Sequence, residues 1–124
     1  MTIWAVLPAA GIGRRMGSTI PKQYLCVDGI PLLTHALRRL GAVDKIKKIV
    51  VVIHPDDTRW AKLEGSIRDE FGDRIMTVIG GDERFHSVLN GLVALTEIAE
   101  NDDWVLVHDA VRPCVRRADI ENLI

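Results

Sequence analysis

The sequence has few cysteines and no excess of either charge, and each shortage argues against a class of protein. Two cysteines in 124 residues do not support a fold held together by several disulfides. Sixteen lysines and arginines stand against seventeen aspartates and glutamates, for a formal charge of -1. This balance provides no polycationic surface, so we expect no general binding to nucleic acid or to membrane surfaces, although a local basic pocket is compatible with it.

Long apolar runs are lacking too. The longest uninterrupted aliphatic run, residues 49–53, falls far short of the roughly 20 residues that a membrane-spanning helix needs. The N-terminus lacks a basic region followed by a long apolar stretch, so we expect no secretory signal, and two isolated cysteines fit a reducing cytoplasm. The composition, with 48% hydrophobic and 27% charged residues, is typical of one globular domain or a piece of a larger one.

Apolar runs rich in β-branched residues predict four buried strands, at residues 3–7, 49–53, 75–79 and 104–107. The runs are nearly continuous rather than alternating, as in a parallel sheet covered on both faces, and the third is the weakest. Helical patterns lie between the strands. The alternation predicts an α/β fold with a doubly wound, mostly parallel sheet and right-handed crossovers. A last helix begins at residues 118–124, and we interpret a chain that stops there as a fragment, truncated on its C-terminal side.

Each of the three expected helices has an apolar face. The first spans residues 31–40 and carries Arg38 and Arg39 opposite that face. The second follows Pro55, with Asp56 and Asp57 as candidates for N-terminal capping, and the third follows residues 80–82. The apolar positions of the three helices are, in turn, Leu32, Leu33, Ala36, Leu37 and Leu40; Trp60, Leu63, Ile67 and Phe71; and Phe85, Val88, Leu89, Leu92, Val93 and Leu95.

Ligands of an open parallel sheet bind outside the carboxyl ends of its strands, so the loops at those ends are functional candidates. The loop after the first strand combines small residues, which let backbone N–H groups approach an anion, with three cations. A polyphosphate would suit this loop. A plain glycine-rich turn is the alternative, but it does not explain the cations. The small residues are Ala9, Ala10, Gly11 and Gly13, and the cations are Arg14, Arg15 and Lys22.

Two common phosphate-binding loops are absent from this segment. A Walker loop requires a second glycine followed by lysine, and Met16 stands at the position of that glycine. The dinucleotide fingerprint fails at the same residue, which should be small, and no acidic residue follows at the end of a second strand. NAD binding is therefore disfavoured.

Three motifs occur in one order along the chain. They are Pro8-Ala9-Ala10-Gly11 with Gly13, Arg15-Met16 and Pro21-Lys22-Gln23-Tyr24; Gly80-Gly81-Asp82-Glu83-Arg84 with Ser87-Val88; and His108-Asp109-Ala110-Val111-Arg112-Pro113. Together they resemble the 2-C-methyl-D-erythritol 4-phosphate cytidylyltransferase family of the non-mevalonate isoprenoid pathway. The resemblance implies a Rossmann-like nucleotidyltransferase architecture, of which residues 1–124 form the N-terminal, nucleotide-binding part. It also implies transfer of a cytidylyl group from CTP to methylerythritol phosphate, with release of pyrophosphate and a requirement for Mg2+ or another divalent cation.

The resemblance also assigns roles to single residues. Arg15 and Lys22 would be catalytic, stabilising the charge that develops on the α-phosphate. Asp109 and Arg112 would bind the acceptor, with Asp109 contacting the metal directly or indirectly. From the residues alone, Asp82 could equally cap the following helix, and Asp109 could simply pair with Arg112. The contacts implied for the nucleotide are Ala9, Ala10, Gly11, Gly13, Gly81, Asp82, Ser87 and Ala110.

The three motifs do not identify the acceptor. Ribitol 5-phosphate cytidylyltransferases resemble the same pattern. Because Val111 stands where the motif frequently has a second alanine, ribitol 5-phosphate stays open as the acceptor. A non-catalytic nucleotide-binding module is another alternative. A guanylyl-transferring molybdopterin-type enzyme is disfavoured, because its opening resembles Leu-Ala-Gly-Gly.

We expect CTP and a polyol phosphate as partners, no nucleic acid or membrane, and a cytoplasmic location. The resemblance implies that the full-length form is a homodimer, built through a later region that also completes the acceptor site. Without that region, we expect weak CTP binding and doubtful catalysis from this chain alone.

Overall fold

Four parallel strands form the central sheet of the protein, whose computed structural model describes residues 2–10, 21–81, 83–100 and 102–108. In chain order they are β1 (Ile3–Ala9), β4 (Ile46–Ile53), β5 (Ile75–Ile79) and β6 (Trp104–Val107). Side by side they run β5-β4-β1-β6. The four predicted strands are confirmed, and β1 and β4 extend beyond the apolar runs that predicted them.

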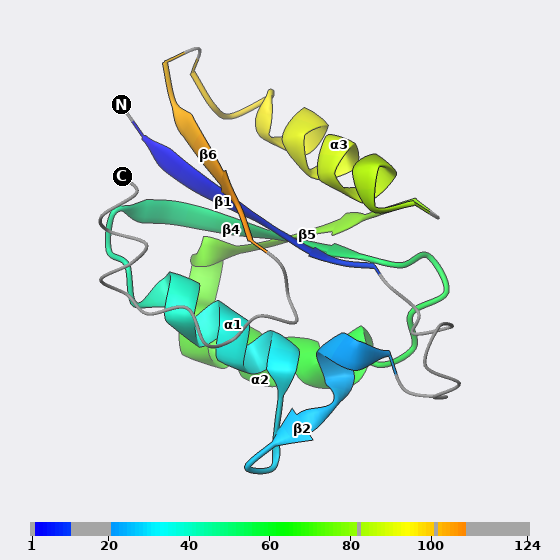
Figure 1. The fold of residues 1–124 in the computed structure, drawn as a ribbon. Helices are drawn as coiled ribbons and strands as arrows, with labels where there is room; N and C mark the ends of the chain where they lie inside the picture. Colours follow the sequence, from blue (N-terminus) through cyan, green and yellow to red (C-terminus); the bar gives the residue numbers. More distant parts are fainter. Residues whose placement is uncertain (1, 11–20, 82, 101, 109–124) are drawn as a thin grey trace.

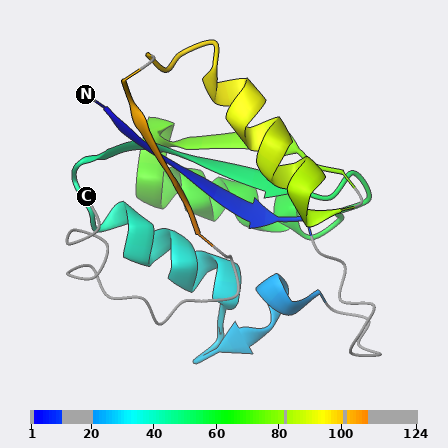
Figure 2. The same cartoon turned by 45° about the horizontal axis from the view of Figure 1, so that its top comes forward.

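Three helices cover the two faces of this sheet. The helices α1 (Leu32–Gly41) and α2 (Trp60–Phe71) lie on one face, and α3 (Arg84–Leu95) lies on the other (Figures 1 and 2). Helices on both faces of a parallel sheet confirm the predicted doubly wound α/β fold. Within the described ranges, we find no helix with the length and apolar character that crossing a membrane requires.

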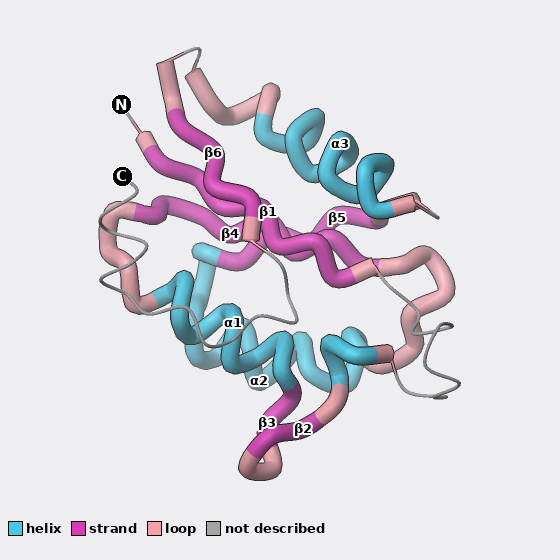
Figure 3. The backbone as a smooth tube through the Cα atoms, viewed as in Figure 1, coloured by secondary structure: helices cyan, strands magenta, loops and turns pink. Residues whose placement is uncertain are grey.

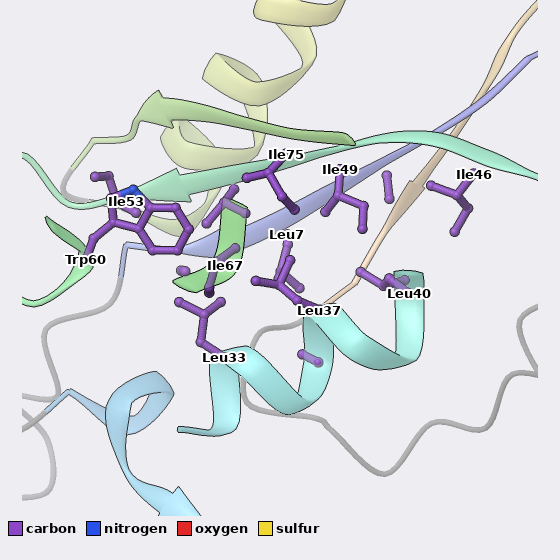
Figure 4. Close-up of a cluster of buried hydrophobic side chains, with 14 of the residues drawn as sticks. Leu7, Leu33, Leu37, Leu40, Ile46, Ile49, Ile53, Trp60, Ile67 and Ile75 are labelled. Atoms are coloured by element: carbon purple, nitrogen blue, oxygen red, sulfur yellow. The ribbon is translucent and has the colours of Figure 1, made fainter. Parts of the chain in front are cut away.

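Strand β1 supplies both layers of the core, because successive side chains of a strand point to opposite faces. Leu7 packs into the cluster beneath α1 and α2, whereas Trp4 and Val6 belong to the cluster beneath α3. Figure 4 shows the first cluster, with Leu33 and Leu37 of α1 facing the sheet. The predicted apolar face of α1 is confirmed: its members Leu33, Ala36, Leu37 and Leu40 are fully buried and Leu32 is half-buried.

The helix α3 forms where it was predicted, but only part of its predicted apolar face packs on the sheet: Leu95 is buried, and Val88 and Leu92 are half-buried. Phe85, Leu89 and Val93 are 64%, 53% and 55% exposed. The buried positions are the small residues Ser87 and Gly91, together with Leu95. A Cβ added at Gly91 would come within 2.8 Å of Val6 Cγ1, so the missing side chain is what lets α3 approach β1 and β4 closely.

Along the chain, a short hairpin that the sequence analysis did not predict lies between β1 and α1. Its strands are β2 (Cys26–Val27) and β3 (Ile30–Pro31), and it extends away from the sheet beyond the helices (Figure 3). Asp28 and Gly29 join the strands with φ of 55° and 77°, the two positive values that a type I′ turn requires. The Asp-Gly pair was the available signal for this turn.

The carboxylate of Asp103 ties the start of β1 to the segment that leads into β6. Its Oδ1 accepts a hydrogen bond from Thr2 N at 2.8 Å, and its Oδ2 accepts from Trp4 Nε1 at 2.9 Å and from Glu100 N at 2.8 Å. These donors, led by the Glu100 N–H and the Trp4 indole, lower the pKa of the Asp103 carboxyl because they stabilise its ionised form.

We predict that Asp103→Asn destabilises the protein at pH 7 and that this difference shrinks in acid. A carboxyl with a lowered folded-state pKa contributes stability above its unfolded pKa of about 3.9, and the contribution is lost as the pH falls through the folded value. Urea unfolding at pH 7 and at pH 3, with the exposed Asp102→Asn as control, measures this difference. A difference between wild type and Asp103→Asn that is the same at both pH values would contradict the prediction.

Candidate functional site

The loops after β1 and β5 meet at the carboxyl end of the sheet. Ala9 and Ile79 both lie in register with Ile53 of β4, and the Gly80 N–H donates to Ile53 O at 2.7 Å. Ala10 follows β1 and Gly80 follows β5. A Cβ added at Gly80 would lie 3.1 Å from the Ala10 Cβ, which shows that the two loops are in contact.

At the same end of the sheet, the pairing of β1 with β6 stops at Val6, whereas its pairing with β4 continues to Ala9. The Val6 carbonyl accepts the His108 N–H at 3.0 Å, so the polar backbone groups of alternate β1 residues, including Pro8, face β6. Proline has no N–H, and therefore Pro8 cannot continue the ladder. The chain reaches β6 from α3, on the face opposite α1, which makes the β1–β6 boundary the switch point of the sheet. Ligands of doubly wound sheets bind at such points.

The structure describes five of the residues that the sequence analysis placed in the site. Ala9, Ala10 and Ser87 are buried, Gly81 is half-buried and Lys22 is exposed. Ala10 and Ser87 come together around Gly80, which carried no predicted role. The other predicted site residues lie outside the described residues: Gly11, Gly13, Arg15, Asp82, Asp109, Ala110 and Arg112.

The contact between Gly80 and Ser87 leaves no room for a side chain at position 80. An added Cβ would overlap Ser87 Oγ and would lie 2.9 Å from Val52 Cγ1. Ser87 is 2% exposed, and its Oγ has no hydrogen-bond partner among the residues that the structure describes. A buried hydroxyl without a partner costs roughly 1–3 kcal/mol, so it is a polar group that a ligand can satisfy.

Lys22 begins the short 3-10 helix η2 (Lys22–Tyr24), whose other two residues are buried. Gln23 Nε2 donates to Ala9 O at 2.8 Å, which joins η2 to the end of β1. The Tyr24 hydroxyl donates to the Asp57 carboxylate. The sequence analysis included Gln23 and Tyr24 in a motif but gave them no role, because their partners lie 14 and 33 positions away.

Asp57 is also the residue that caps the start of α2, as predicted. Its Oδ1 accepts from Arg59 N at 2.7 Å and from Trp60 N at 2.8 Å. Asp56, the other capping candidate, instead donates its N–H to His54 Nδ1 at 3.0 Å. Burial, followed by the hydrogen bond to Asp57, raises the pKa of Tyr24 far above its ordinary value, so the hydroxyl stays protonated and remains a donor.

The described residues include one group of carboxylates close enough to share a metal ion. It lies at the amino end of the sheet, away from the loops after β1 and β5. Glu100, Asp102 and Asp103 precede β6, beside the start of β1. Both oxygens of Asp103 already accept hydrogen bonds that hold the fold together. This group is therefore not the metal site expected from the resemblance, for which Asp109 was the candidate.

Comparisons with known proteins match the chain to one family and one fold. Residues 3–124 match the IspD family, 2-C-methyl-D-erythritol 4-phosphate cytidylyltransferase. Enzymes of that name from Shewanella loihica and Hahella chejuensis are 47% and 43% identical, over 97% and 98% of this chain and 46% and 49% of their own lengths. The chain thus spans about half the length of the curated relatives it matches.

Solved structures show the same fold. A crystal structure of 4-diphosphocytidyl-2C-methyl-D-erythritol synthase has a TM-score of 0.82 and 29% identity, over 99% of this chain and 53% of that one. The synthase from Anaerococcus prevotii has a TM-score of 0.74 and 28% identity, over 98% of this chain and 48% of its own.

We predict that Gly80→Ala lowers the free energy of unfolding by about 1–3 kcal/mol, because the new methyl group overlaps Ser87 and presses on Val52. Gly65→Ala is the matched control: Gly65 is an exposed glycine of α2 with nothing within 4 Å of an added Cβ. That change should stabilise the protein by roughly 0.5–1 kcal/mol through helix propensity. Chemical denaturation measures both, and equal effects of the two substitutions would show that position 80 is not tightly packed.

Proposed function

Because this chain belongs to the 2-C-methyl-D-erythritol 4-phosphate cytidylyltransferase family, we propose that it supplies the nucleotide-binding part of an enzyme that transfers a cytidylyl group from CTP to 2-C-methyl-D-erythritol 4-phosphate. Pyrophosphate is the other product, and the reaction serves isoprenoid precursor biosynthesis. One observation carries the proposal: the small-residue loops after β1 and β5 meet beside the Ser87 hydroxyl, which has no partner within the described ranges, at the carboxyl end of the sheet.

In this reaction the acceptor phosphate attacks the α-phosphorus of CTP in line with the leaving pyrophosphate. Both reactants are anions, so charge repulsion and positioning form most of the barrier, and no side chain has to act as the nucleophile. In the proposal, Lys22 and Arg15 stabilise the charge that develops on the α-phosphate and on the bridging oxygen. Lys22 is suited to this role because η2 holds it beside the end of β1.

The nucleotide and the acceptor take separate sets of residues in the proposal. The base and ribose of CTP lie against Gly81 and Ser87, with Asp82, and the triphosphate lies along the loop after β1. Asp109 and Arg112 bind the acceptor, and Asp109 is the residue that would hold Mg2+, mainly alongside phosphate and water oxygens. When bound, Mg2+ neutralises phosphate charge.

Nucleotide binding without transfer is the second candidate for the 124-residue chain taken alone, because it spans about half the length of its relatives. Pyrophosphate release separates the possibilities when CTP is offered with each acceptor. Release with methylerythritol phosphate supports the proposal, and release only with ribitol 5-phosphate supports that alternative acceptor. Binding of CTP without release supports the module. The homodimer and the cytoplasmic location stay predictions.

We predict that Lys22→Ala or Arg15→Ala, in a chain of the full family length, lowers turnover by about 10³-fold or more while the fold stays intact. The loss of a fixed cation at a transferring phosphoryl group typically costs roughly 3–4 kcal/mol of barrier. Initial rates of pyrophosphate release measure the effect, and circular dichroism checks the fold. Lys62→Ala, on the exposed side of α2, is the control. Near-normal turnover of either variant would remove its proposed role.

We predict opposite effects of Ser87→Ala on stability and on binding. Removing a buried hydroxyl that lacks a partner should leave the free energy of unfolding unchanged or raise it by about 1 kcal/mol. Affinity for Mg-CTP should fall about fivefold, because one hydrogen bond to the nucleotide is lost. Thermal unfolding and titration calorimetry measure the two quantities, with the exposed Ser66→Ala as control. A variant that is less stable but binds Mg-CTP normally would assign Ser87 to packing alone.

A further inference from the structure

The cation Lys22 lies on a very short element. The 3-10 helix η2 has three residues, and the hairpin β2–β3 follows it directly. Within η2, Tyr24 N donates to Pro21 O at 2.9 Å, and Leu25 N donates to Lys22 O at 3.1 Å. These bonds close the turn, but they do not fix it against the sheet. A group that stabilises a transition state must be held in place, because a displacement of about 1 Å can cost 10²-fold in rate.

The residue after Lys22 provides the first attachment to the sheet. Gln23 is 4% exposed, and its Nε2 lies 2.8 Å from the carbonyl of Ala9, the last residue of β1. A carbonyl oxygen can only accept, so the amide nitrogen is the group that faces it. Gln23 shares a peptide bond with Lys22. The hydrogen bond therefore sets the position of the Lys22 backbone relative to Ala9, where the loop for the triphosphate begins.

Tyr24 provides the second attachment. Its buried hydroxyl donates to Asp57, whose other oxygen accepts the N–H groups of Arg59 and of Trp60, the first residue of α2. The turn η2 is thus tied to two neighbouring strands, to β1 directly and to β4 through the loop that follows it. Two attachments at adjacent residues restrict rotation of the turn as well as its translation.

We propose that Gln23 is a positioning residue, which holds Lys22 at the phosphate-binding loop through its hydrogen bond to Ala9, with Tyr24 and Asp57 as the second hold. This inference rests on the proposed function, in which Lys22 acts on the α-phosphate. An apolar residue of similar length could fill the same buried space. The amide adds a directed bond to the strand that carries the loop.

A double-mutant cycle with titration calorimetry tests the link to Lys22. Gln23→Met keeps the length of the side chain and removes the donor. We expect it to weaken Mg-CTP binding by about fivefold in the chain with Lys22, and to have no further effect in the Lys22→Ala background. Tyr24→Phe should show the same dependence on Lys22. An equal loss of affinity in both backgrounds would make Gln23 a packing residue only and would overturn the proposal.

Trypsin provides a second measurement that needs no ligand. Trypsin cleaves after lysine, and the initial rate of cleavage after Lys22, followed by mass spectrometry, reports how firmly η2 is held. We expect Gln23→Met to raise this rate about fivefold or more, while cleavage after Lys62 in α2 stays unchanged. Asn90→Ala is the matched control, because Asn90 Nδ2 also donates to the last residue of a strand, Ile79 O at 3.1 Å, but far along the chain from Lys22.

Together with the turnover of Lys22→Ala, the two measurements distinguish a failure of the positioning role of Gln23 from a failure of the proposed role of Lys22. An unchanged rate of cleavage after Lys22 would overturn the positioning role, whatever the affinity for Mg-CTP. If Lys22→Ala in a chain of the full family length turns over nearly as fast as the unsubstituted enzyme, the proposed role of Lys22 fails, and the positioning of Lys22 then has no catalytic consequence. Faster cleavage together with a loss of affinity that requires Lys22 supports the proposal.

Discussion

The position of β1 in the middle of the sheet is the constraint on which the rest of the structure depends. It pairs with β4 on one edge and with β6 on the other, and Ala5, Val6 and Leu7 are fully buried. Burying apolar surface contributes about 25 cal/mol for each Å², so a strand that is buried on both faces contributes to stability through both layers of the core. Side-chain hydrogen bonds then fix both of its ends, from Asp103 at the start and from Gln23 at Ala9.

Close packing of α3 connects this framework to the candidate site. Gly91 lets the helix approach Val6 and Val52. Ser87 lies one turn earlier on the same buried face, so the same approach brings its hydroxyl against Gly80. The small residues of α3 therefore have two consequences: they close the core on that face of the sheet, and they place a polar group between the loops after β1 and β5.

The strands and helices could be predicted from the sequence because burial on both faces leaves a direct pattern, a continuous apolar run. The packing face of α3 could be predicted only in part, because Leu92 and Leu95 pack on the core as their apolar character indicates. Phe85, Leu89 and Val93 have the same character but are exposed, and small residues, serine and glycine, take the other buried positions. The hairpin had a local signal in Asp28-Gly29. The hydrogen bonds that attach η2 to the sheet had no signal in the sequence, because bonds between residues 14 and 33 positions apart leave no periodic pattern. The predicted site residues stay predictions.

The way in which η2 is held also bears on the charge of Lys22. A carboxylate bonded directly to this amine would fix it equally well, but it would compete with a phosphate for the same cation. In the described part of the chain, Lys22 has no such ion pair, and the hold is made by a neutral amide and a protonated phenol on the two following residues. The one carboxylate involved, Asp57, is shared between the phenol and two N–H groups at the start of α2. The position of Lys22 is thus fixed through the backbone while its positive charge is not neutralised by any described carboxylate, and this is the arrangement that the proposed transfer between two anions requires.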